Sequence, residues 1–280
     1  MFAFKIYPNL QFYYLLIITI IRPKKYYFVF LLQFYIITFK LMLTKSHIKL
    51  ITSLKQKKFR QQEQLFVVEG IKGINEFLNS SFELHILFST ETIFNAEMIL
   101  ISDKELQKIS SLKSPNTAVA IFKIPKRTNT IAQGLVLALD DVRDPGNLGT
   151  IIRLCDWFGI KQLVCSNATV DCYNSKVVQA TMGSLARIDI QYVDLEAYLK
   201  AYQEDVFGTF MDGNNIYLET LPNSGIIVMG NEANGISKTI EKRVTKKISI
   251  PRFGDVQATE SLNVATATSI VLSEFKRFNG

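Results

Sequence analysis

Apolar positions follow three different patterns along the chain. Residues 1–41 contain two apolar runs, 10–21 and 26–39, that carry no charge. From Met42 to about residue 124, short apolar segments alternate between helical and extended spacing. Beyond residue 134 the apolar segments become continuous, and a run such as 135–139 is typical of a strand buried on both faces of a parallel sheet. The pattern predicts an α/β protein built from two parts.

The apolar spacing in the first part, residues 42–124, predicts a small α/β domain in which short helices and strands alternate. We expect strands over 65–68, 84–88 and 118–124, and helices over 47–60, 71–78 and 103–111. Such alternation is typical of one compact layered domain. The segment 125–134 begins with a proline and a polar stretch without periodicity, so we expect it to be a linker.

The second part, residues 135–280, predicts an open, mostly parallel sheet covered by helices. The expected strands are 135–139, 162–165, 188–193, 206–211, 226–229 and 247–250. The expected helices are 147–158, 175–182, 195–202 and 261–276. In sheets of this class ligands bind beyond the carboxyl ends of the strands, so we look for function there.

Residues 1–41 differ from the rest of the chain. They hold 13 of its 32 aromatic residues and five cations but no carboxylate. Neither apolar run reaches the roughly 18–20 residues that a spanning helix needs, and no small-residue cleavage site follows. We expect this hydrophobic extension not to be part of the native protein, which then begins at Met42. A hydrophobic hairpin or membrane anchor is the alternative, and a membrane partner is expected only if residues 1–41 are genuine.

Charge points to nucleic acid only locally. The net charge is +7, but residues 1–41 supply +5 of it. A basic cluster opens the first part, and we expect its members Lys55, Lys57, Lys58 and Arg60 to contact RNA phosphates. A solvated basic face is the alternative. The three cysteines have spacings that fit no zinc pattern, so we expect reduced thiols in a cytoplasmic protein and no metal.

Three segments at predicted strand ends carry candidate chemistry. The first, 140–153, leads from a buried strand into a helix that begins near Asn147, and it includes Gly149 and Arg153. Asn147 either binds a ligand or caps the helix, while Gly149 lets another segment approach closely. The second, 228–236, places Glu232 among glycines and asparagines, where a tight turn is the alternative.

The third segment joins Ile250-Pro251-Arg252-Phe253-Gly254 to the start of the last helix, where an N-cap at Ser261 is the alternative to a functional role. No Gly-x-Gly-x-x-Gly follows any strand and no Gly-x-x-x-x-Gly-Lys occurs. A dinucleotide-dependent oxidoreductase is therefore disfavoured.

The three segments, in this order, resemble the SpoU/TrmH branch of the SPOUT RNA methyltransferases over about residues 135–275. The first family motif is matched by Asn147, Gly149 and Arg153, and the second by Gly230, Glu232 and Gly235. The third is matched by Ile250-Pro251 and Ser261-Leu262-Asn263-Val264. Residues 42–124 resemble the family's ribosomal-protein-like substrate-binding domain, notably at Phe66-Val67-Val68-Glu69-Gly70.

The resemblance implies both a fold and a reaction. It implies a trefoil knot near the carboxyl end, a homodimer around it, and methyl transfer from S-adenosylmethionine to a ribose 2'-hydroxyl of RNA. Ribosomal RNA is favoured over transfer RNA because of the first domain. A catalytically inactive RNA-binding relative is the alternative.

The resemblance also implies roles for single residues. The cofactor is expected at Met229, Gly230, Ile250 and Leu262, and Arg153 is the expected catalytic cation, since a guanidinium can stabilise a developing alkoxide. Orienting roles are expected for Asn147, Glu232, Ser261 and Asn263. Arg252 and Phe253 are expected to contact an RNA phosphate and to stack on a base.

Overall fold

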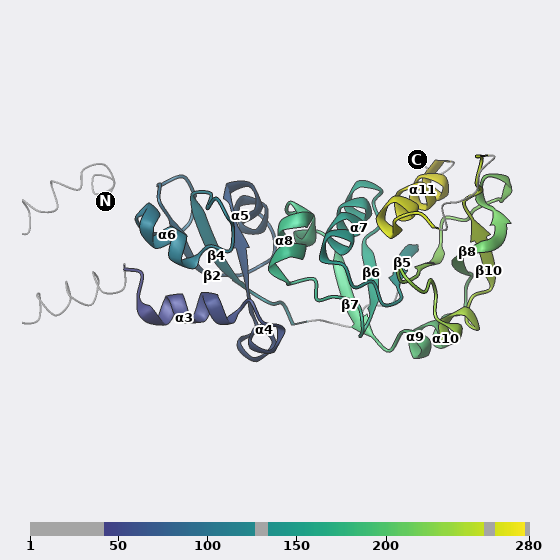
Figure 1. Ribbon diagram of the computed structural model, residues 1–280, viewed down its shortest axis with the longest axis horizontal. Helices are drawn as coiled ribbons and strands as arrows, with labels where there is room; N and C mark the ends of the chain where they lie inside the picture. The colour runs from purple at the N-terminus through teal and green to yellow at the C-terminus, as the bar shows by residue number, and fades with distance from the viewer. Residues whose placement is uncertain (1–41, 127–133, 255–260, 278–280) are drawn as a thin grey trace, which may run out of the picture.

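The computed structural model describes residues 42–126, 134–254 and 261–277, and these form two sheets with their helices (Figure 1). The upstream extension predicted for residues 1–41 and most of the predicted linker lie outside these ranges. Within them, every helix is too short or too polar to cross a membrane.

The first sheet has the order β1-β4-β2-β3. Its strands are β1 (Leu65–Glu69), β2 (Leu84–Ser89), β3 (Ile99–Leu100) and β4 (Ala118–Lys123). Successive side chains of β1 point to opposite faces of this sheet, so each face has its own apolar layer. Phe66 and Val68 pack with α5 (Ile71–Leu78), while Leu65 and Val67 face the other way. That second face is covered by α3 (Lys45–Ser53) and α6 (Asp103–Ile109). The three longer strands were predicted, whereas β3 has two residues and leaves no periodic signal.

One predicted helix, 47–60, is two helices in the structure. After α3 the chain turns at residues 54–56 and restarts as α4 (Lys57–Glu63). The Arg60 side chain reaches back into this turn, where its Nη1 donates to the carbonyl oxygens of Leu54 at 2.8 Å and Lys55 at 2.9 Å. These contacts satisfy carbonyls that a helix end would otherwise leave unpaired.

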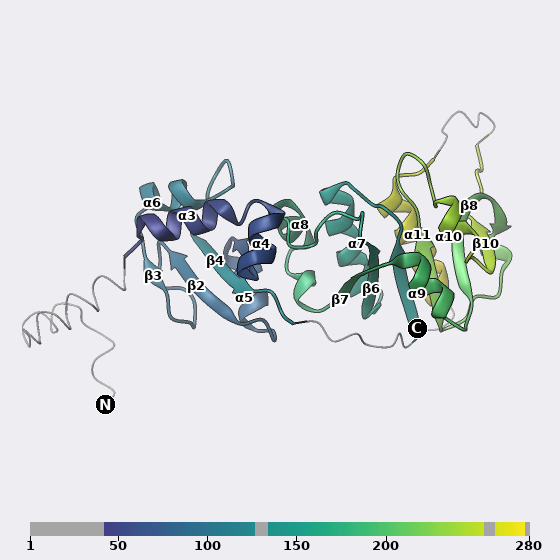
Figure 2. The same ribbon diagram turned by 90° about the horizontal axis from the view of Figure 1, so that it is seen from below.

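The second sheet has six strands in the order β10-β8-β9-β5-β6-β7, and every neighbouring pair is parallel. The strands are β5 (Leu135–Leu139), β6 (Gln162–Ser166), β7 (Asp189–Val193), β8 (Val206–Asn215), β9 (Gly225–Met229) and β10 (Lys246–Ser249). One face packs against α7 (Pro145–Trp157) and α11 (Val264–Arg277), and the other against α9 (Leu195–Ala201) and α10 (Lys238–Glu241) (Figures 1 and 2). The predicted parallel α/β sheet is confirmed.

The edge of this sheet departs from the predicted pattern. Strand β8 runs four residues beyond the predicted end at Met211, and its pairing with β10 jumps from Gly208↔Lys247 to Asn214↔Ile248. At Gly213 a Cβ would lie 2.5 Å from the Ile248 carbonyl carbon, so only glycine allows the two chains this approach. The trefoil knot that the resemblance implies stays a prediction.

Helix α8 (Ser175–Thr181) lies between the two sheets (Figure 1). A Cβ on Gly149 of α7 would lie 2.4 Å from the Ala180 Cβ, so the close approach predicted at this glycine is made by α8. On the other side, the Tyr173 ring lies 4.6 Å from the ring of Phe66 in β1. One continuous apolar core therefore runs through both parts of the chain.

Two ion-pair groups bridge the same boundary. The Arg60 guanidinium donates to Asp171 from Nε at 2.9 Å and from Nη2 at 2.5 Å, with the two side chains only 3% and 14% exposed. The more exposed Arg187 pairs with Asp156 at 2.7 Å and also with Glu76. The buried Arg60 guanidinium thus forms its hydrogen bonds with Asp171 and with the carbonyls of Leu54 and Lys55. The prediction that Arg60 contacts an RNA phosphate is therefore wrong.

We expect Asp171→Ala to lower the free energy of unfolding by about 3–5 kcal/mol, since it leaves the buried Arg60 charge without its partner. Glu83→Ala, which removes the solvent-exposed Lys123–Glu83 pair, is the matched control and should cost at most about 1 kcal/mol. Urea unfolding of both variants measures the difference. Equal losses would contradict a structural role for the Arg60–Asp171 pair.

Candidate functional site

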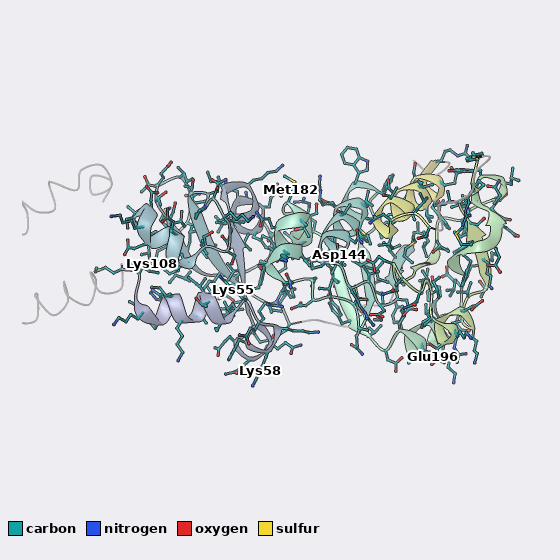
Figure 3. All side chains as sticks on the ribbon, viewed as in Figure 1. Lys55, Lys58, Lys108, Asp144, Met182 and Glu196 are labelled. Atoms are coloured by element: carbon teal, nitrogen blue, oxygen red, sulfur yellow. The ribbon has the colours of Figure 1, made fainter. Side chains whose placement is uncertain are left out.

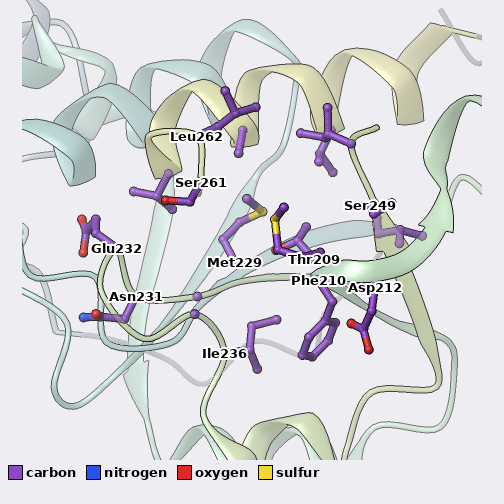
Figure 4. A pocket seen from close by; sticks show the side chains of 18 of the residues that line it. Thr209, Phe210, Asp212, Met229, Asn231, Glu232, Ile236, Ser249, Ser261 and Leu262 are labelled. Atoms are coloured by element: carbon purple, nitrogen blue, oxygen red, sulfur yellow. The ribbon is translucent and has the colours of Figure 1, made fainter. Parts of the chain in front are cut away.

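A cleft of about 880 Å³ opens at the carboxyl ends of β8, β9 and β10, beside the start of α11 (Figure 4). All four residues predicted to hold the cofactor, Met229, Gly230, Ile250 and Leu262, line it. Glu232, Ser261 and Arg252 line it as well. Residues 229–236, 250–252 and 261–262 therefore meet at one site.

The loop after β9 forms one wall of the cleft as a tight turn. The Asn231 and Gly235 backbones exchange two hydrogen bonds of 2.9 Å. The Asn231 side-chain oxygen accepts from the backbone of Ala233 at 2.8 Å, and its Nδ2 donates to the Asp141 carbonyl at 2.6 Å. The Asn/Gly turn that stood as the alternative to a ligand-binding loop is thus present, and it builds the cleft.

Gly230 is required by this turn. A Cβ there would lie 2.3 Å from both the Gly235 carbonyl carbon and the Ile236 nitrogen, a distance that real Cβ atoms do not show. The collision is with the loop's own backbone. Gly230 therefore keeps the loop folded in addition to lining the cleft.

The predicted orienting residues Asn147, Glu232 and Asn263 meet in one hydrogen-bonded chain at the edge of the cleft. The Asn147 Nδ2 donates to Glu232 Oε1 at 2.9 Å, and the Asn147 Oδ1 accepts from Asn263 Nδ2 at 2.9 Å. Each residue comes from a different one of the three segments singled out in the sequence. The amide of Asn147 therefore joins all three segments, because it both donates and accepts.

Helix caps explain why these amides are available. Asp144 caps α7, accepting from the Asn147 backbone at 2.8 Å, so the Asn147 side chain is left for Glu232 and Asn263. At α11 the side-chain oxygen of Asn263 accepts from Ala265 at 3.0 Å and Thr266 at 3.2 Å. The alternative that Ser261 caps the last helix is wrong, because the helix begins at Val264 and Asn263 caps it.

Arg153 is not brought into this group. It lies six residues after Asn147, about 9 Å further along the axis of α7, on an exposed face that does not line the cleft. Among the described residues no side chain forms an ion pair with it. Cys155, two residues on, is fully buried, and burial raises the pKa of its thiol, which leaves it unreactive.

Two aromatic rings stand near the mouth of the cleft. Phe253 is 81% exposed, and its ring stacks on Tyr217 with centroids 6.3 Å apart and an interplanar angle of 29°. Tyr217 was not predicted as a site residue, because it follows β8 and belongs to none of the three candidate segments. An exposed stacked pair beside a cationic Arg252 offers a flat surface to a ring.

The cleft suits S-adenosylmethionine in shape and chemistry. Its middle is apolar, at Met229 and Ile236, while Glu232 with Ser261 and Asp212 with Ser249 place polar groups at opposite ends (Figure 4). An apolar pocket with a few convergent polar groups is what a nucleoside with a charged tail requires. The sequence did not single out Thr209, Phe210 and Asp212, which also line the cleft. Thr209 and Phe210 lie inside the predicted strand 206–211 but belong to none of the three segments that carry candidate chemistry, and Asp212 lies just beyond the predicted end of that strand.

The described residues contain no group of three or more His, Cys, Asp or Glu side chains arranged to hold a metal ion. All three cysteines are buried thiols.

Comparison with known proteins agrees with the geometry. Residues 134–273 match the SpoU rRNA Methylase family, and residues 45–120 match the MRM3-like substrate binding domain. The chain belongs to the SpoU rRNA methylase family. The family predicted from the three sequence segments is therefore confirmed.

Individual relatives span most of this SpoU family chain. The 23S rRNA (guanosine(2553)-2'-O)-methyltransferase RlmP of Bacillus subtilis (strain 168) is 29% identical over 231 residues, which cover 78% of this chain and 91% of the relative. A structure assigned to the TrmH family of RNA methyltransferases, from Porphyromonas gingivalis, is 36% identical with a TM-score of 0.77, covering 85% of this chain and 100% of that one. The AdoMet-bound rRNA methyltransferase of Sinorhizobium meliloti is 28% identical with a TM-score of 0.76, covering 85% and 97%.

We expect Gly230→Ala to weaken S-adenosylmethionine binding by at least about tenfold and to lower the free energy of unfolding by about 1–3 kcal/mol, because the added methyl group forces the Asn231–Gly235 turn apart. Calorimetric titration and urea unfolding measure the two effects. Gly254→Ala, where a Cβ meets nothing within 4 Å, is the control for stability. Unchanged cofactor affinity in Gly230→Ala would separate the turn from the cofactor site.

Proposed function

We propose that this SpoU family chain transfers a methyl group from S-adenosylmethionine to a ribose 2'-hydroxyl of ribosomal RNA. The observation that carries the proposal is the Asn147–Glu232–Asn263 chain of hydrogen bonds at the edge of the apolar cleft. Supporting it, the Bacillus subtilis relative is named as a 23S rRNA 2'-O-methyltransferase, and the Sinorhizobium meliloti relative carries AdoMet.

The cofactor would lie between Met229 and Gly230 on one side and Ile250 and Leu262 on the other. S-adenosylmethionine, when bound, supplies an electrophilic methyl group on a sulfonium sulfur. The walls of the cleft exclude water from that group, and the turn at Asn231 fixes the wall rigidly. Holding a ribose at a fixed place beside it lowers the entropic part of the barrier by several kcal/mol.

The 2'-hydroxyl is oriented by the polar groups at the Glu232 end of the cleft. The Asn147 amide holds the Glu232 side chain in place through Oε1, and Ser261 lies at the same end (Figure 4). Asn263 fixes the Asn147 amide in turn. These residues act as positioning groups for the ribose.

Arg153 supplies positive charge. A guanidinium stays protonated at neutral pH and is no ordinary base, but it pairs with phosphate and stabilises negative charge that develops on oxygen. Its exposed place on α7, outside the cleft, suits contact with the RNA backbone at the reacting nucleotide. We therefore infer that Arg153 stabilises the negative charge that develops during methyl transfer.

The rest of the RNA would follow the basic side chains of the first part. Lys55 in the turn after α3 and Lys57 and Lys58 at the start of α4 are exposed, and Lys58 lies at the lower edge of the molecule in Figure 3. Arg252 and the Phe253 ring offer a phosphate contact and a stacking surface at the cleft.

We further infer the division into a substrate-binding domain at residues 42–124, a linker at 125–134 and a catalytic domain at 135–280. A homodimer formed through the catalytic domain and a cytoplasmic location complete the proposal, and light scattering of the purified protein tests the dimer.

We expect Arg153→Ala to reduce kcat by at least about 100-fold and to leave S-adenosylmethionine affinity within about twofold, because Arg153 lies outside the cofactor cleft. Arg153→Lys keeps the charge but not the guanidinium fork, so it should recover part of the rate. Single-turnover methyl transfer and calorimetry give the two readings. Near-normal turnover in Arg153→Ala would remove Arg153 from the reaction.

We expect the triple change Lys55→Ala, Lys57→Ala, Lys58→Ala to weaken RNA binding and to flatten its dependence on salt, since each phosphate contact releases about one counterion. RNA affinity across a range of potassium chloride concentrations measures the slope. A triple change at Lys104, Lys108 and Lys113, which are also exposed, is the control for charge alone. Matching slopes in both variants would contradict a specific contact at the α3–α4 turn.

Nucleoside analysis tests the proposed reaction. Ribosomal RNA from a deletion strain is incubated with the enzyme and methyl-labelled cofactor, digested and analysed by mass spectrometry, and the label is expected on ribose. Label on a base would overturn the assignment of the methylated atom. Cofactor binding without transfer to any RNA would favour the inactive relative.

A further inference from the structure

A second cavity lies between α4 and the segment that follows β6. Its volume is about 320 Å³, and we call it the α4 pocket. Gln61 and Lys57 of α4 form one side, Asn167 and Tyr173 the other, and Pro125 and Lys126 the end. The pocket exists because the buried Arg60–Asp171 pair holds α4 against the second sheet.

The α4 pocket opens at the same sheet edge as the cofactor cleft. Asn167 follows the carboxyl end of β6, and Gly230 follows that of β9, with β5 between them. Parallel strands spaced about 4.8 Å apart place these two ends about 10 Å from each other. A few nucleotides of one RNA strand reach from one site to the other.

Hydrogen bonds link the segments behind the two sites. The Val170 backbone donates to the Val142 carbonyl at 2.9 Å, and the Asp141 backbone donates to Ser166 Oγ at 2.9 Å. Asn231 then donates to the Asp141 carbonyl at 2.6 Å. The wall of the α4 pocket is thereby fixed relative to the turn that lines the cleft.

The chemistry of the lining fits a nucleotide. Gln61 and Asn167 are exposed and present amides that both donate and accept, as the edge of a base requires. Pro125 and the Tyr173 ring provide apolar surface for its faces. Lys57 and Lys126, which form no ion pair among the described residues, stand where a phosphate would need them.

The one carboxylate in the pocket does not oppose this charge. Asp171 accepts two hydrogen bonds from the Arg60 guanidinium and one from the Tyr173 backbone at 3.0 Å. Its negative charge is neutralised inside the protein, so the pocket keeps the positive charge of its lysines.

We propose that the α4 pocket is a subsite that binds one unpaired nucleotide of the substrate RNA, a few nucleotides away from the one that is methylated. This inference rests on the proposed function, because it takes RNA as the substrate. The subsite selects an RNA strand whose bases are splayed out, since a paired base cannot enter a pocket of this size.

Steady-state methyl transfer to ribosomal RNA from a deletion strain tests the subsite. We expect Gln61→Ala and Asn167→Ala each to raise the KM for RNA about 2- to 10-fold, as the loss of one or two hydrogen bonds predicts. The kcat and the S-adenosylmethionine affinity should stay within about twofold. Gln107→Ala, an exposed amide on α6 away from the pocket, is the matched control and should leave KM unchanged.

The outcomes separate the subsite from the proposed function. A wild-type KM in both pocket variants overturns the subsite while leaving the methyl transfer intact. If the wild type methylates no RNA at all, the proposed function is overturned, and the affinity of wild type and variants for the same RNA then decides the subsite: equal affinities overturn it and weaker variants support it. Guanosine monophosphate and adenosine monophosphate are tested as competitive inhibitors of methyl transfer to RNA. If either inhibits at a concentration similar to the KM for RNA, the α4 pocket is a free-nucleotide site and the proposal is overturned.

Discussion

The Asn147 side chain holds together the three segments that form the site. Its amide donates to Glu232 from the loop after β9 and accepts from Asn263 at the start of α11. A side-chain amide provides both functions from one rigid group. The geometry depends on a further condition, that Asp144 and not Asn147 caps α7. The edge of the cleft is therefore assembled because Asp144 caps the helix and leaves the Asn147 side chain to bind Glu232 and Asn263.

The second constraint on the molecule is close approach of backbones. Gly149 lets α8 pack against α7, Gly213 lets β8 approach β10, and Gly230 lets the loop after β9 fold onto itself. None of the three has a positive φ, so what the fold requires at these positions is space and not an unusual backbone conformation. The contact at Gly230 shapes the wall of the cleft, and the contact at Gly213 brings together the two strands β8 and β10 beside it. The contact at Gly149 packs α8 against α7, the helix that carries Asn147.

Much of this was predictable from the sequence, and the failures have local causes. The continuous run 135–139 predicted β5 without error, because a strand buried on both faces leaves a strong signal. The predicted helix 47–60 failed because Arg60 interrupts it through a partner 111 residues away, which no local pattern encodes. Asn263 was recognised as a site residue, but Ser261 was the residue considered as a cap, since Ser and Asn cap helices equally well. Tyr217 and Asp212 reach the site through the irregular end of β8, where a strand pattern has already faded.

The separation between Arg60 and Asp171 has a consequence for the order in which the chain folds. A ribosome that adds about 5–20 residues per second makes Arg60 roughly 5–20 s before its partner, given the 111 residues between them. During that interval the turn after α3 has its apolar neighbours but not the carboxylate that buries its guanidinium. The ion pair that holds α4 against the second part of the chain therefore forms only after synthesis has reached Asp171. The corner of the molecule that carries the exposed Lys55, Lys57 and Lys58 is completed by a carboxylate from the second part of the chain.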